Sequence, residues 1–209
     1  MAVQNLKLFS MEAEQGRWIL VATGLLINVC LGSIYAFSVF RKPLEGLWGI
    51  TSSQSGYPFM VFLAVFAVAM PLAGNLIARW GPRNTATLGG LLAGTGWIAA
   101  SFSTDIATLT LLYGVIGGAG VGIVYGCPIA VVAKWFSRYS GLAIGLTVMG
   151  FGVSALLIAP LMKSMILQPD IGIMHTFLYL GIAFTVVITL LAQLFNMPSN
   201  AASPLKLAP

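Results

Sequence analysis

The chain has 209 residues, of which 58% are hydrophobic and 7% are charged, and its formal net charge is +5. Its mean hydropathy is +0.96. Because soluble domains are about 25% charged, the ten basic and five acidic residues of this chain are too few to cover a water-exposed surface. The composition therefore excludes a soluble enzyme and a nucleic-acid-binding domain, and it predicts an integral membrane protein.

Charged residues divide the chain into six long stretches that contain no Asp, Glu, Lys or Arg. The shortest stretch has 21 residues and lies between Arg83 and Asp105. A helix needs about 20 apolar residues to cross about 30 Å of hydrocarbon, and it satisfies its own backbone polar groups there. We therefore predict an all-α integral membrane bundle with six transmembrane helices. The predicted spans are residues 18–40, 57–78, 84–103, 106–133, 142–162 and 172–195.

These spans divide the basic residues unequally between the two sides of the membrane. The side that holds both termini carries Lys7, Arg17, Arg79, Arg83, Lys134, Arg138 and Lys206, and the opposite side carries Arg41, Lys42 and Lys163. Because basic loops are retained in the cytoplasm, we predict that both termini are cytoplasmic and that the protein is a multi-pass component of the cell inner (plasma) membrane. Residues 1–17 form a lead-in, 18–196 the bundle and 197–209 a disordered tail. The scattered basic residues predict no nucleic-acid partner.

A faint internal repeat relates the two halves of the predicted bundle. The matching segments are GSIY at 32–35 with GIVY at 122–125, Ser-Gly at 55–56 with Ser-Gly at 140–141, and Met-Pro-Leu at 70–72 with Ala-Pro-Leu at 159–161. Because three helices is an odd number, a second unit of three is inserted upside down relative to the first. We therefore predict two inverted three-helix repeats, about 18–103 and 106–196, an arrangement typical of secondary transporters.

Glycines recur at four-residue spacing in the fourth and fifth predicted helices. They are Gly114, Gly118, Gly122 and Gly126 in the fourth helix, and Gly141 and Gly145 in the fifth. This spacing places them on one helix face, where the missing side chain lets two backbones approach closely. Generic membrane packing explains any single pair. The longer row also suits a helix that slides or bends against its neighbours, as a rocking transporter requires.

A few polar side chains interrupt the apolar spans. Asn28, Gly32, Tyr35 and Ser38 form a narrow stripe in the first helix, and Tyr125 lies on the glycine-rich face of the fourth. Such groups face either a neighbouring helix or a water-filled cavity, and both interpretations stay open for Asn28 and Tyr35. We take Tyr35, Tyr125, Asn28 and Ser38 as candidate residues of a solute pathway.

No predicted span contains a charged residue in its interior, and only His175 lies near the start of the sixth helix. The chain therefore supplies no intramembrane cation for an anionic solute, whose counter-charge must come from elsewhere. Ser154 and His175 resemble the pair of an intramembrane serine protease, but the serine lies in GVSAL and lacks the GxSG surroundings. The sequence has no metal-ligand cluster and no phosphate loop, so we predict a protein that is not an enzyme and needs no metal or cofactor.

The segment GNLIARWGPR at residues 74–83 resembles the signature loop of the major facilitator superfamily. In that pattern a Gly, a Leu, an Asp-Arg pair, a second Gly and a final basic residue follow one another. The matching residues are Gly74, Leu76, Arg79, Gly81 and Arg83, and Ala78 stands where the family has Asp. In the family this Asp helps to lock the two halves of the carrier in the outward-facing state, so this departure puts that lock in doubt.

Three further stretches resemble the oxalate/formate antiporter family and its monocarboxylate-carrying relatives. They are GSIYAFSVFRKPLE, YGVIGGAGVGIVYGCPIAVVAKWF and GLAIGLTVMGFGVSALLIAPL. Such carriers have two six-helix halves with the substrate between them, so the resemblance implies that this chain is an N-terminal half. It also implies that Tyr35 and Tyr125 match aromatic residues lining the pocket, and that the cations meeting a dicarboxylate come from the C-terminal half.

The predicted function is secondary transport of small carboxylate anions, such as oxalate, formate or lactate, by alternating access. A six-helix bundle alone does not enclose a gated path, so we predict a partner: a second six-helix half, or a second copy in a homodimer. The alternative is a truncated or non-transporting membrane subunit that assembles through its glycine-rich faces.

Overall fold

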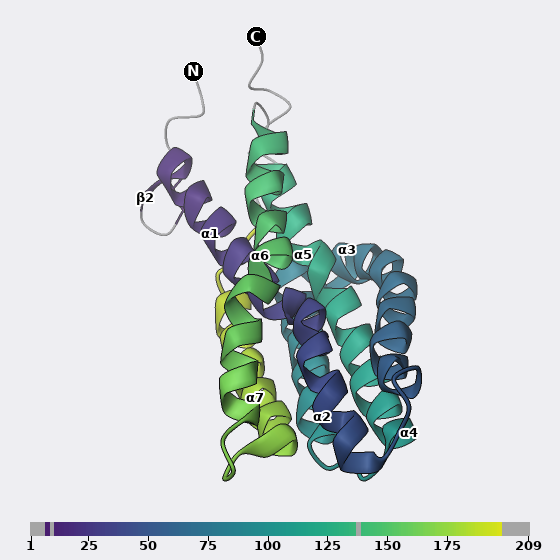
Figure 1. Ribbon diagram of the computed structural model, residues 1–209. Coiled ribbons are helices and arrows are strands. Elements are labelled where there is room, and N and C mark those ends of the chain that lie inside the picture. The colour runs from purple at the N-terminus through teal and green to yellow at the C-terminus, as the bar shows by residue number, and fades with distance from the viewer. Residues whose placement is uncertain (1–6, 9–10, 137–138, 198–209) are drawn as a thin grey trace, which may run out of the picture.

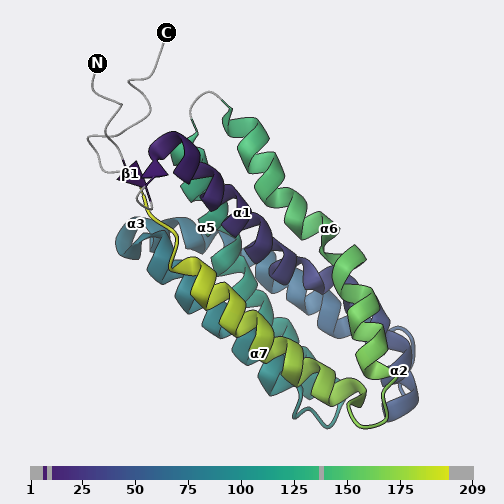
Figure 2. The same ribbon diagram turned by 90° about the vertical axis from the view of Figure 1, so that its left-hand side faces the viewer.

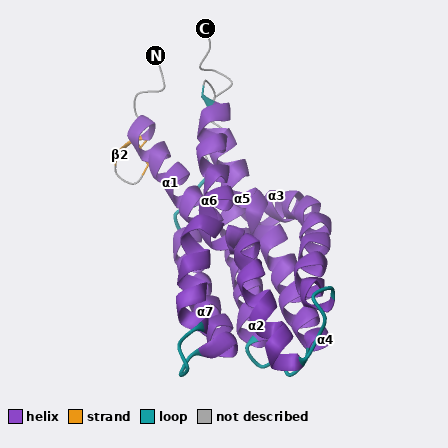
Figure 3. Cartoon of the chain, viewed as in Figure 1, coloured by secondary structure: helices purple, strands orange, loops and turns teal. Residues whose placement is uncertain are grey.

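The computed structural model describes residues 7–8, 11–136 and 139–197, and nearly all of them are helical (Figures 1 and 3). The longer helices are α1 (Ala13–Leu31), α2 (Ser38–Trp48), α3 (Tyr57–Ala100), α5 (Gly118–Trp135), α6 (Ser140–Ile166) and α7 (Gly172–Ala192). The shorter helical segments are η1 (Gly32–Phe37), η2 (Gln54–Gly56), α4 (Ile106–Leu109) and η3 (Thr110–Gly117). Two strands, β1 (Lys7–Leu8) and β2 (Met11–Glu12), pair antiparallel in the predicted lead-in.

The first helix is longer than the sequence predicts. α1, η1 and α2 follow one another without a break, and residues Gln15–Trp48 form one apolar helix of 34 residues. It ends where Gly49 takes a left-handed conformation with φ of 62°, which glycine adopts without Cβ strain. The sequence prediction ended this helix at residue 40 because Arg41 follows. A charged residue limits the hydrocarbon-spanning part of a helix, whereas the helix itself continues outside it.

α3 consists of two halves that meet at Gly81, whose φ of 77° and ψ of 165° are not helical. The apolar helix that includes α3, Gln54–Ala100, has 47 residues and is one of five in the described chain with the length and composition to cross a membrane. At 1.5 Å per residue it would extend about 70 Å, more than twice the roughly 30 Å of hydrocarbon. The break at Gly81 divides this length into two helices.

The two halves of α3 run in opposite directions along η3 and α5. Residue numbers rise together along the contact with the first half, whereas they run oppositely along the contact with the second half. The contacting pairs are Gly114 with Pro58, Gly118 with Phe62 and Gly122 with Phe66 for the first half, and Gly117 with Gly96 and Val124 with Gly89 for the second. α3 is therefore a hairpin of two antiparallel helices, as the sequence predicts for spans 57–78 and 84–103.

The start of α1 and the end of α7 lie toward the same end of the bundle (Figure 2). The Trp18 ring of α1 lies edge-on to Phe136 with ring centroids 5.0 Å apart, and Trp135 donates a hydrogen bond from Nε1 to the carbonyl of Asn196 at 2.7 Å. The end of α5 thus contacts both the start of α1 and the chain that follows α7.

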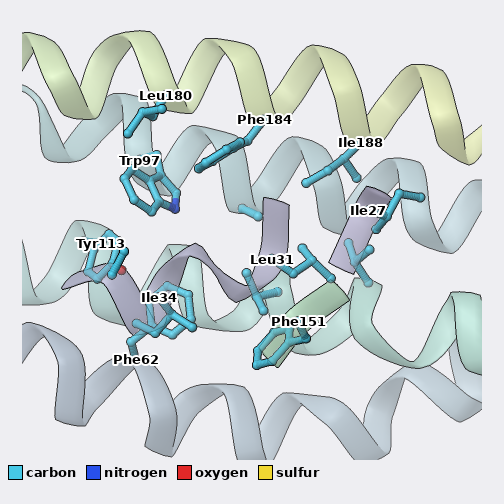
Figure 4. Close-up of a cluster of buried hydrophobic side chains, with 14 of the residues drawn as sticks. Ile27, Leu31, Ile34, Phe62, Trp97, Tyr113, Phe151, Leu180, Phe184 and Ile188 are labelled. Atoms are coloured by element: carbon cyan, nitrogen blue, oxygen red, sulfur yellow. The ribbon is translucent and has the colours of Figure 1, made fainter. Parts of the chain in front are cut away.

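Aromatic side chains from η1, η3, α3 and α7 pack together inside the bundle, and Figure 4 shows Tyr113 and Trp97 of this group. Tyr113 of η3 is fully buried, and its ring stacks on Phe37 of η1 at 5.1 Å and lies edge-on to Trp97 of α3 at 5.1 Å. Phe177 of α7 contacts the same tyrosine at 5.6 Å. Such ring pairs contribute about 0.5–1.5 kcal/mol each beyond area burial. Because lipid is as apolar as a leucine side chain, contacts of this kind rather than hydrophobic burial hold membrane helices together.

Glycines make the closest helix crossings. A Cβ built at Gly122 of α5 would lie 2.8 Å from the carbonyl oxygen of Phe66 in α3, and one at Gly32 of η1 would overlap the carbonyl oxygen of Phe151 in α6. The four glycines spaced four residues apart in the fourth predicted helix face the first half of α3: Gly114, Gly118, Gly122 and Gly126. The glycine-rich face of this helix is therefore occupied within the chain.

Gly141 and Gly145, which the sequence predicts to pack in the same way, do not contact another helix of the described chain. No atom lies within 4 Å of a Cβ built at either position. The four-residue spacing predicts a helix face without side chains, but it does not predict what covers that face. The same spacing occurs where the face contacts another helix and where it is open.

The Gly81 turn is anchored to the end of α7. Arg83 donates from Nε to Oε1 of Gln193 at 2.6 Å, and the amide of Gln193 donates to the hydroxyl of Thr87 at 3.1 Å. A further bond of 2.8 Å joins this amide to the carbonyl of Thr189, one turn earlier in α7. One glutamine thus links the start of the second half of α3 to α7.

The glycine crossings yield a first prediction. We expect Gly122→Ala to lower the free energy of unfolding by about 1–3 kcal/mol, because overpacking forces helices apart and the new Cβ would meet the backbone of Phe66. Gly145→Ala is the matched control, and its higher helix propensity is expected to raise stability by up to about 1 kcal/mol. Thermal unfolding of the purified chain in detergent measures both. Equal changes in the two variants would contradict the crossing.

The Gln193 link yields a second prediction. Gln193→Leu removes the partner of Arg83 and Thr87, and we expect a loss of about 0.5–1.5 kcal/mol for each hydrogen bond together with faster proteolysis at the Gly81 turn. Arg79→Ala serves as the control, since the Arg79 side chain is exposed and has no hydrogen bond within the described residues. Limited proteolysis and denaturant unfolding measure the two effects. A larger loss in Arg79→Ala than in Gln193→Leu would refute the anchoring.

Candidate functional site

Four aromatic side chains from η1, α3, α5 and α6 meet in one cluster. The Tyr35 ring lies edge-on to Phe151 with centroids 5.2 Å apart, and the Tyr125 ring lies edge-on to the same Phe151 at 5.1 Å. Phe66 stacks on Phe151 at 6.1 Å and is edge-on to Tyr125 at 5.5 Å. We call Tyr35, Phe66, Tyr125 and Phe151 the aromatic quartet. The structure thus brings two tyrosines ninety residues apart in the sequence into one site.

The quartet has a buried floor and an open side. Phe151 is 7% exposed, whereas Tyr35 is 47% exposed; Phe66 and Tyr125 are partly buried. Neither tyrosine hydroxyl has a hydrogen-bond partner among the described residues. A phenol can donate a hydrogen bond to a carboxylate oxygen, and aromatic walls with a few polar groups are typical of small-molecule sites. The quartet therefore has the chemistry to contact a small planar anion but supplies no charge.

Glycines bring the four helices of the quartet together. Gly32 precedes Tyr35 by three residues, and Gly122 precedes Tyr125 by three. Each glycine lies where its helix crosses the helix that bears a quartet phenylalanine. Because a side chain at either position would overlap backbone of the opposing helix, these glycines allow each tyrosine to reach a phenylalanine on that helix.

The two crossings use equivalent residues. A Cβ built at Gly32 would meet the carbonyl of Phe151 and the Cβ of Ser154, and one built at Gly122 would meet the carbonyl of Phe66 and the Cβ of Ala69. The glycines and tyrosines are 90 residues apart, and Phe66 and Ala69 are each 85 residues before Phe151 and Ser154. The same offsets relate GSIY to GIVY and the two Ser-Gly pairs.

Asn28 and Ser38, the other candidates in the first helix, lie in different surroundings. Asn28 is fully buried, and its Nδ2 donates to the carbonyl of Gly24 at 3.0 Å. Its Cβ lies 3.3 Å from a Cβ built at Gly150 of α6, so this side chain is in the crossing of α1 and α6. The Asn28 Oδ1 is buried without a partner among the described residues. Ser38 is exposed at the start of α2.

The signature-loop residues lie around the break in α3. Gly81 supplies the non-helical backbone, and Arg83 is held by Gln193. Arg79 and Ala78 are exposed, Leu76 is partly buried, and a Cβ built at Gly74 would meet nothing within 4 Å. Among the described residues, the loop's final basic residue is therefore bonded within this chain, whereas Arg79 is left exposed.

Ser154 and His175 are each bonded to backbone. Ser154 is buried and donates to the carbonyl of Val29 in α1, while His175 is exposed with Nδ1 at 2.9 Å from the carbonyl of Ile171. The serine thus ties α6 to α1. In the described part of the chain no group of three or more His, Cys, Asp or Glu side chains could hold a metal ion.

Sequence reasoning missed the two phenylalanines of the quartet. Apolar residues are abundant in every span, so Phe66 and Phe151 do not stand out by type. Their separation of 85 residues, however, equals the offset between Ser55 and Ser140. Extending that offset along the repeat would have singled them out.

Comparison with known proteins assigns the family. A family model described as the Major Facilitator Superfamily matches residues 18–208. The oxalate:formate antiporter of Oxalobacter formigenes is 30% identical over 185 residues, which are 88% of this chain and 44% of that protein. Monocarboxylate transporter 1 of Bos taurus is 34% identical over 145 residues, 68% of this chain and 28% of that protein. The chain therefore spans less than half the length of these relatives.

Solved structures show the same fold. The inward-open xylose transporter XylE from E. coli superposes with a TM-score of 0.68 at 15% identity, over 93% of this chain and 50% of that one. A peptide transporter bound to alafosfalin gives a TM-score of 0.65 at 16% identity. These relatives are membrane transporters, not enzymes. By sequence and by fold, the chain belongs to the Major Facilitator Superfamily.

Proposed function

We propose that this chain is the N-terminal half of a secondary transporter that moves small carboxylate anions by alternating access. The observation that carries the proposal is the match to the oxalate:formate antiporter, which covers 88% of this chain and 44% of the relative. Monocarboxylate transporters match 68% and 72% of this chain. The solutes proposed are therefore oxalate, formate, lactate or similar carboxylates.

The proposed topology has six crossings of the inner membrane and places both termini on its cytoplasmic side. The hairpin in α3 supports the sixth crossing, and the shared end of α1 and α7 supports an even number. The excess of basic residues on the terminal side supports the cytoplasmic orientation. The equivalent contacts of Gly32 with Phe151 and of Gly122 with Phe66 support two inverted three-helix repeats.

The proposed solute site is the open side of the aromatic quartet. Tyr35 and Tyr125 donate hydrogen bonds to the carboxylate, and the rings of the quartet border it with their electropositive edges. Because an anion within the membrane needs a counter-charge and no span interior of this chain has one, the cation comes from a second six-helix half. Ser38, exposed at the start of α2, lies on the proposed route to this site, and Asn28 stabilises the crossing beneath it.

The proposed partner contacts α6 and the first half of α3. Gly141, Gly145 and Gly152 of α6 and Gly74 of α3 have open space at their Cβ positions. The glycines of α5, by contrast, are covered by α3. A second half, or a second copy of this chain, would therefore approach closely at the open α6 and α3 glycines rather than at α5. The same open faces would serve the alternative, a membrane subunit that assembles without transporting.

Reconstitution tests the proposed function. The chain is purified, paired with the separately expressed C-terminal six helices of the Oxalobacter formigenes antiporter, and incorporated into liposomes loaded with oxalate. We expect exchange of labelled oxalate or formate above that of empty vesicles. Absence of exchange and of solute binding, with either the chain alone or the folded pair, would refute the transport function.

Tyrosine variants of the same pair test the site. Because a hydrogen bond to a charged group contributes about 1.5–3 kcal/mol, Tyr35→Phe and Tyr125→Phe should each weaken solute binding about 10- to 100-fold. Tyr179→Phe is the matched control, since Tyr179 of α7 is 48% exposed and Tyr35 is 47% exposed. Equal affinities of all three variants would place the solute elsewhere.

A further inference from the structure

The quartet contains two phenylalanines, which have no hydrogen-bonding group: Phe151 contacts both candidate tyrosines and Phe66 contacts Tyr125. Phe151 packs against Tyr35 at 5.2 Å and against Tyr125 at 5.1 Å, with interplanar angles of 86° and 70°. Phe66 contacts Tyr125 at 5.5 Å and an angle of 79°. Edge-to-face geometry is the preferred arrangement of aromatic pairs, so each tyrosine ring is fixed in direction by a phenylalanine.

Each tyrosine is packed by a phenylalanine from the other half of the chain. Tyr35 belongs to η1 and contacts Phe151 of α6, whereas Tyr125 belongs to α5 and contacts Phe66 of α3. The arrangement is not fully symmetric, because Tyr125 also contacts Phe151. Phe151 is therefore shared by both tyrosines, and Phe66 serves one.

The contacts with the phenylalanines hold both tyrosine rings while leaving them partly exposed. Phe151 is 7% exposed and lies beneath Tyr35, which is 47% exposed. A half-exposed tyrosine without such a neighbour would sample several rotamers, and ordering a side chain on binding weakens affinity. A ring that is already held avoids this cost, and it fixes the distance between the two hydroxyls.

We propose that Phe151 is a positioning residue for solute recognition, which orients Tyr35 and Tyr125 together and so selects the size of the carboxylate that both hydroxyls reach. Phe66 acts in the same way on Tyr125 alone. This inference rests on the proposed function, because it assumes that the two hydroxyls bind the solute.

The role of Phe151 is separable from the helix crossing beside it. The close approach of η1 and α6 is made by the backbone of Phe151 at Gly32, which a substitution of the Phe151 side chain leaves in place. Phe151→Leu keeps an apolar side chain there but removes the ring, and Phe151→Tyr keeps the ring. Comparison of the two therefore tests the ring itself.

The test uses the reconstituted pair of halves, with 3-fluorotyrosine incorporated and the signals of Tyr35 and Tyr125 assigned by Tyr→Phe variants. Loss of the Phe151 ring removes its ring current from both tyrosines. We expect Phe151→Leu to shift both fluorine signals and Phe66→Leu to shift the Tyr125 signal only. Phe195→Leu is the control, because Phe195 is 3% exposed and has no ring contact with either tyrosine.

Oxalate exchange kinetics supply the functional readout. Each tyrosine that loses its phenylalanine neighbour is expected to raise KM about 2- to 10-fold. Phe66→Leu affects Tyr125 alone, whereas Phe151→Leu affects both tyrosines and should raise KM more. We expect kcat to change little in either variant. Phe151→Leu should also reduce the selectivity for oxalate over longer dicarboxylates. Phe151→Tyr, which keeps the ring, should leave KM close to that of the unsubstituted chain. A structural role alone would lower the amount of folded protein in Phe151→Leu and leave KM and the size preference unchanged, and this result would overturn the proposal.

The outcomes separate this inference from the function on which it rests. If Tyr35→Phe and Tyr125→Phe leave KM unchanged, the proposed site is wrong. If they raise KM while Phe66→Leu and Phe151→Leu do not, the site stands and the positioning role is overturned. If Phe151→Leu does not fold, Phe66→Leu decides, since an unchanged Tyr125 signal and KM in that variant contradict the mechanism.

Discussion

The structure depends on backbone-to-backbone contact at glycines. In lipid, apolar side chains gain nothing by leaving the solvent, so helices associate only where close approach gives dense packing. Gly32 and Gly122 provide this approach at the two crossings that carry the quartet, and Gly120 and Gly96 provide it between the second half of α3 and the helix formed by η3 and α5. A side chain at any of these positions would push the two backbones apart and loosen the ring contacts formed beside them.

The same contacts set the geometry of the candidate site. A crossing made at a glycine fixes the separation of two helix axes, and residues one turn away then face each other at a defined distance. Tyr35 and Tyr125 each follow such a glycine by three residues. Their contact with Phe151 is thus a consequence of packing that is needed for the fold, and the site requires no separate structural element.

Much of the fold could be predicted because charge limits the length of a membrane helix. The gaps between charged residues predicted the helical class and the hairpin that turns at Gly81. The repeat of GSIY and GIVY indicated that Tyr35 and Tyr125 occupy equivalent positions. Helix ends were less accurate: α1 begins at Ala13 and α2 continues to Trp48, because a helix extends beyond the hydrocarbon that charge delimits.

The remaining features depend on which helix faces which, and hydropathy does not encode this in a membrane protein. Lipid-facing and buried positions are equally apolar, so the open face at Gly145 and the packed face at Gly118 have the same sequence pattern. The bond between Arg83 and Gln193 joins residues 110 positions apart. Asn28 is polar, yet it is buried in a crossing, because a short amide can bond to the carbonyl one turn earlier in its own helix.

The distribution of charge supports the proposed need for a second half, because no span interior of this chain contains a charged residue. A carboxylate that leaves water loses several kcal/mol of solvation, which tyrosine hydroxyls compensate only in part. A fixed cation placed within this bundle would itself need a partner while no solute is bound. In the proposed carrier, a cation on the second half would lie against the solute only when the two halves enclose the site. The charge-free wall formed by the quartet and a charged opposing wall would then have complementary roles.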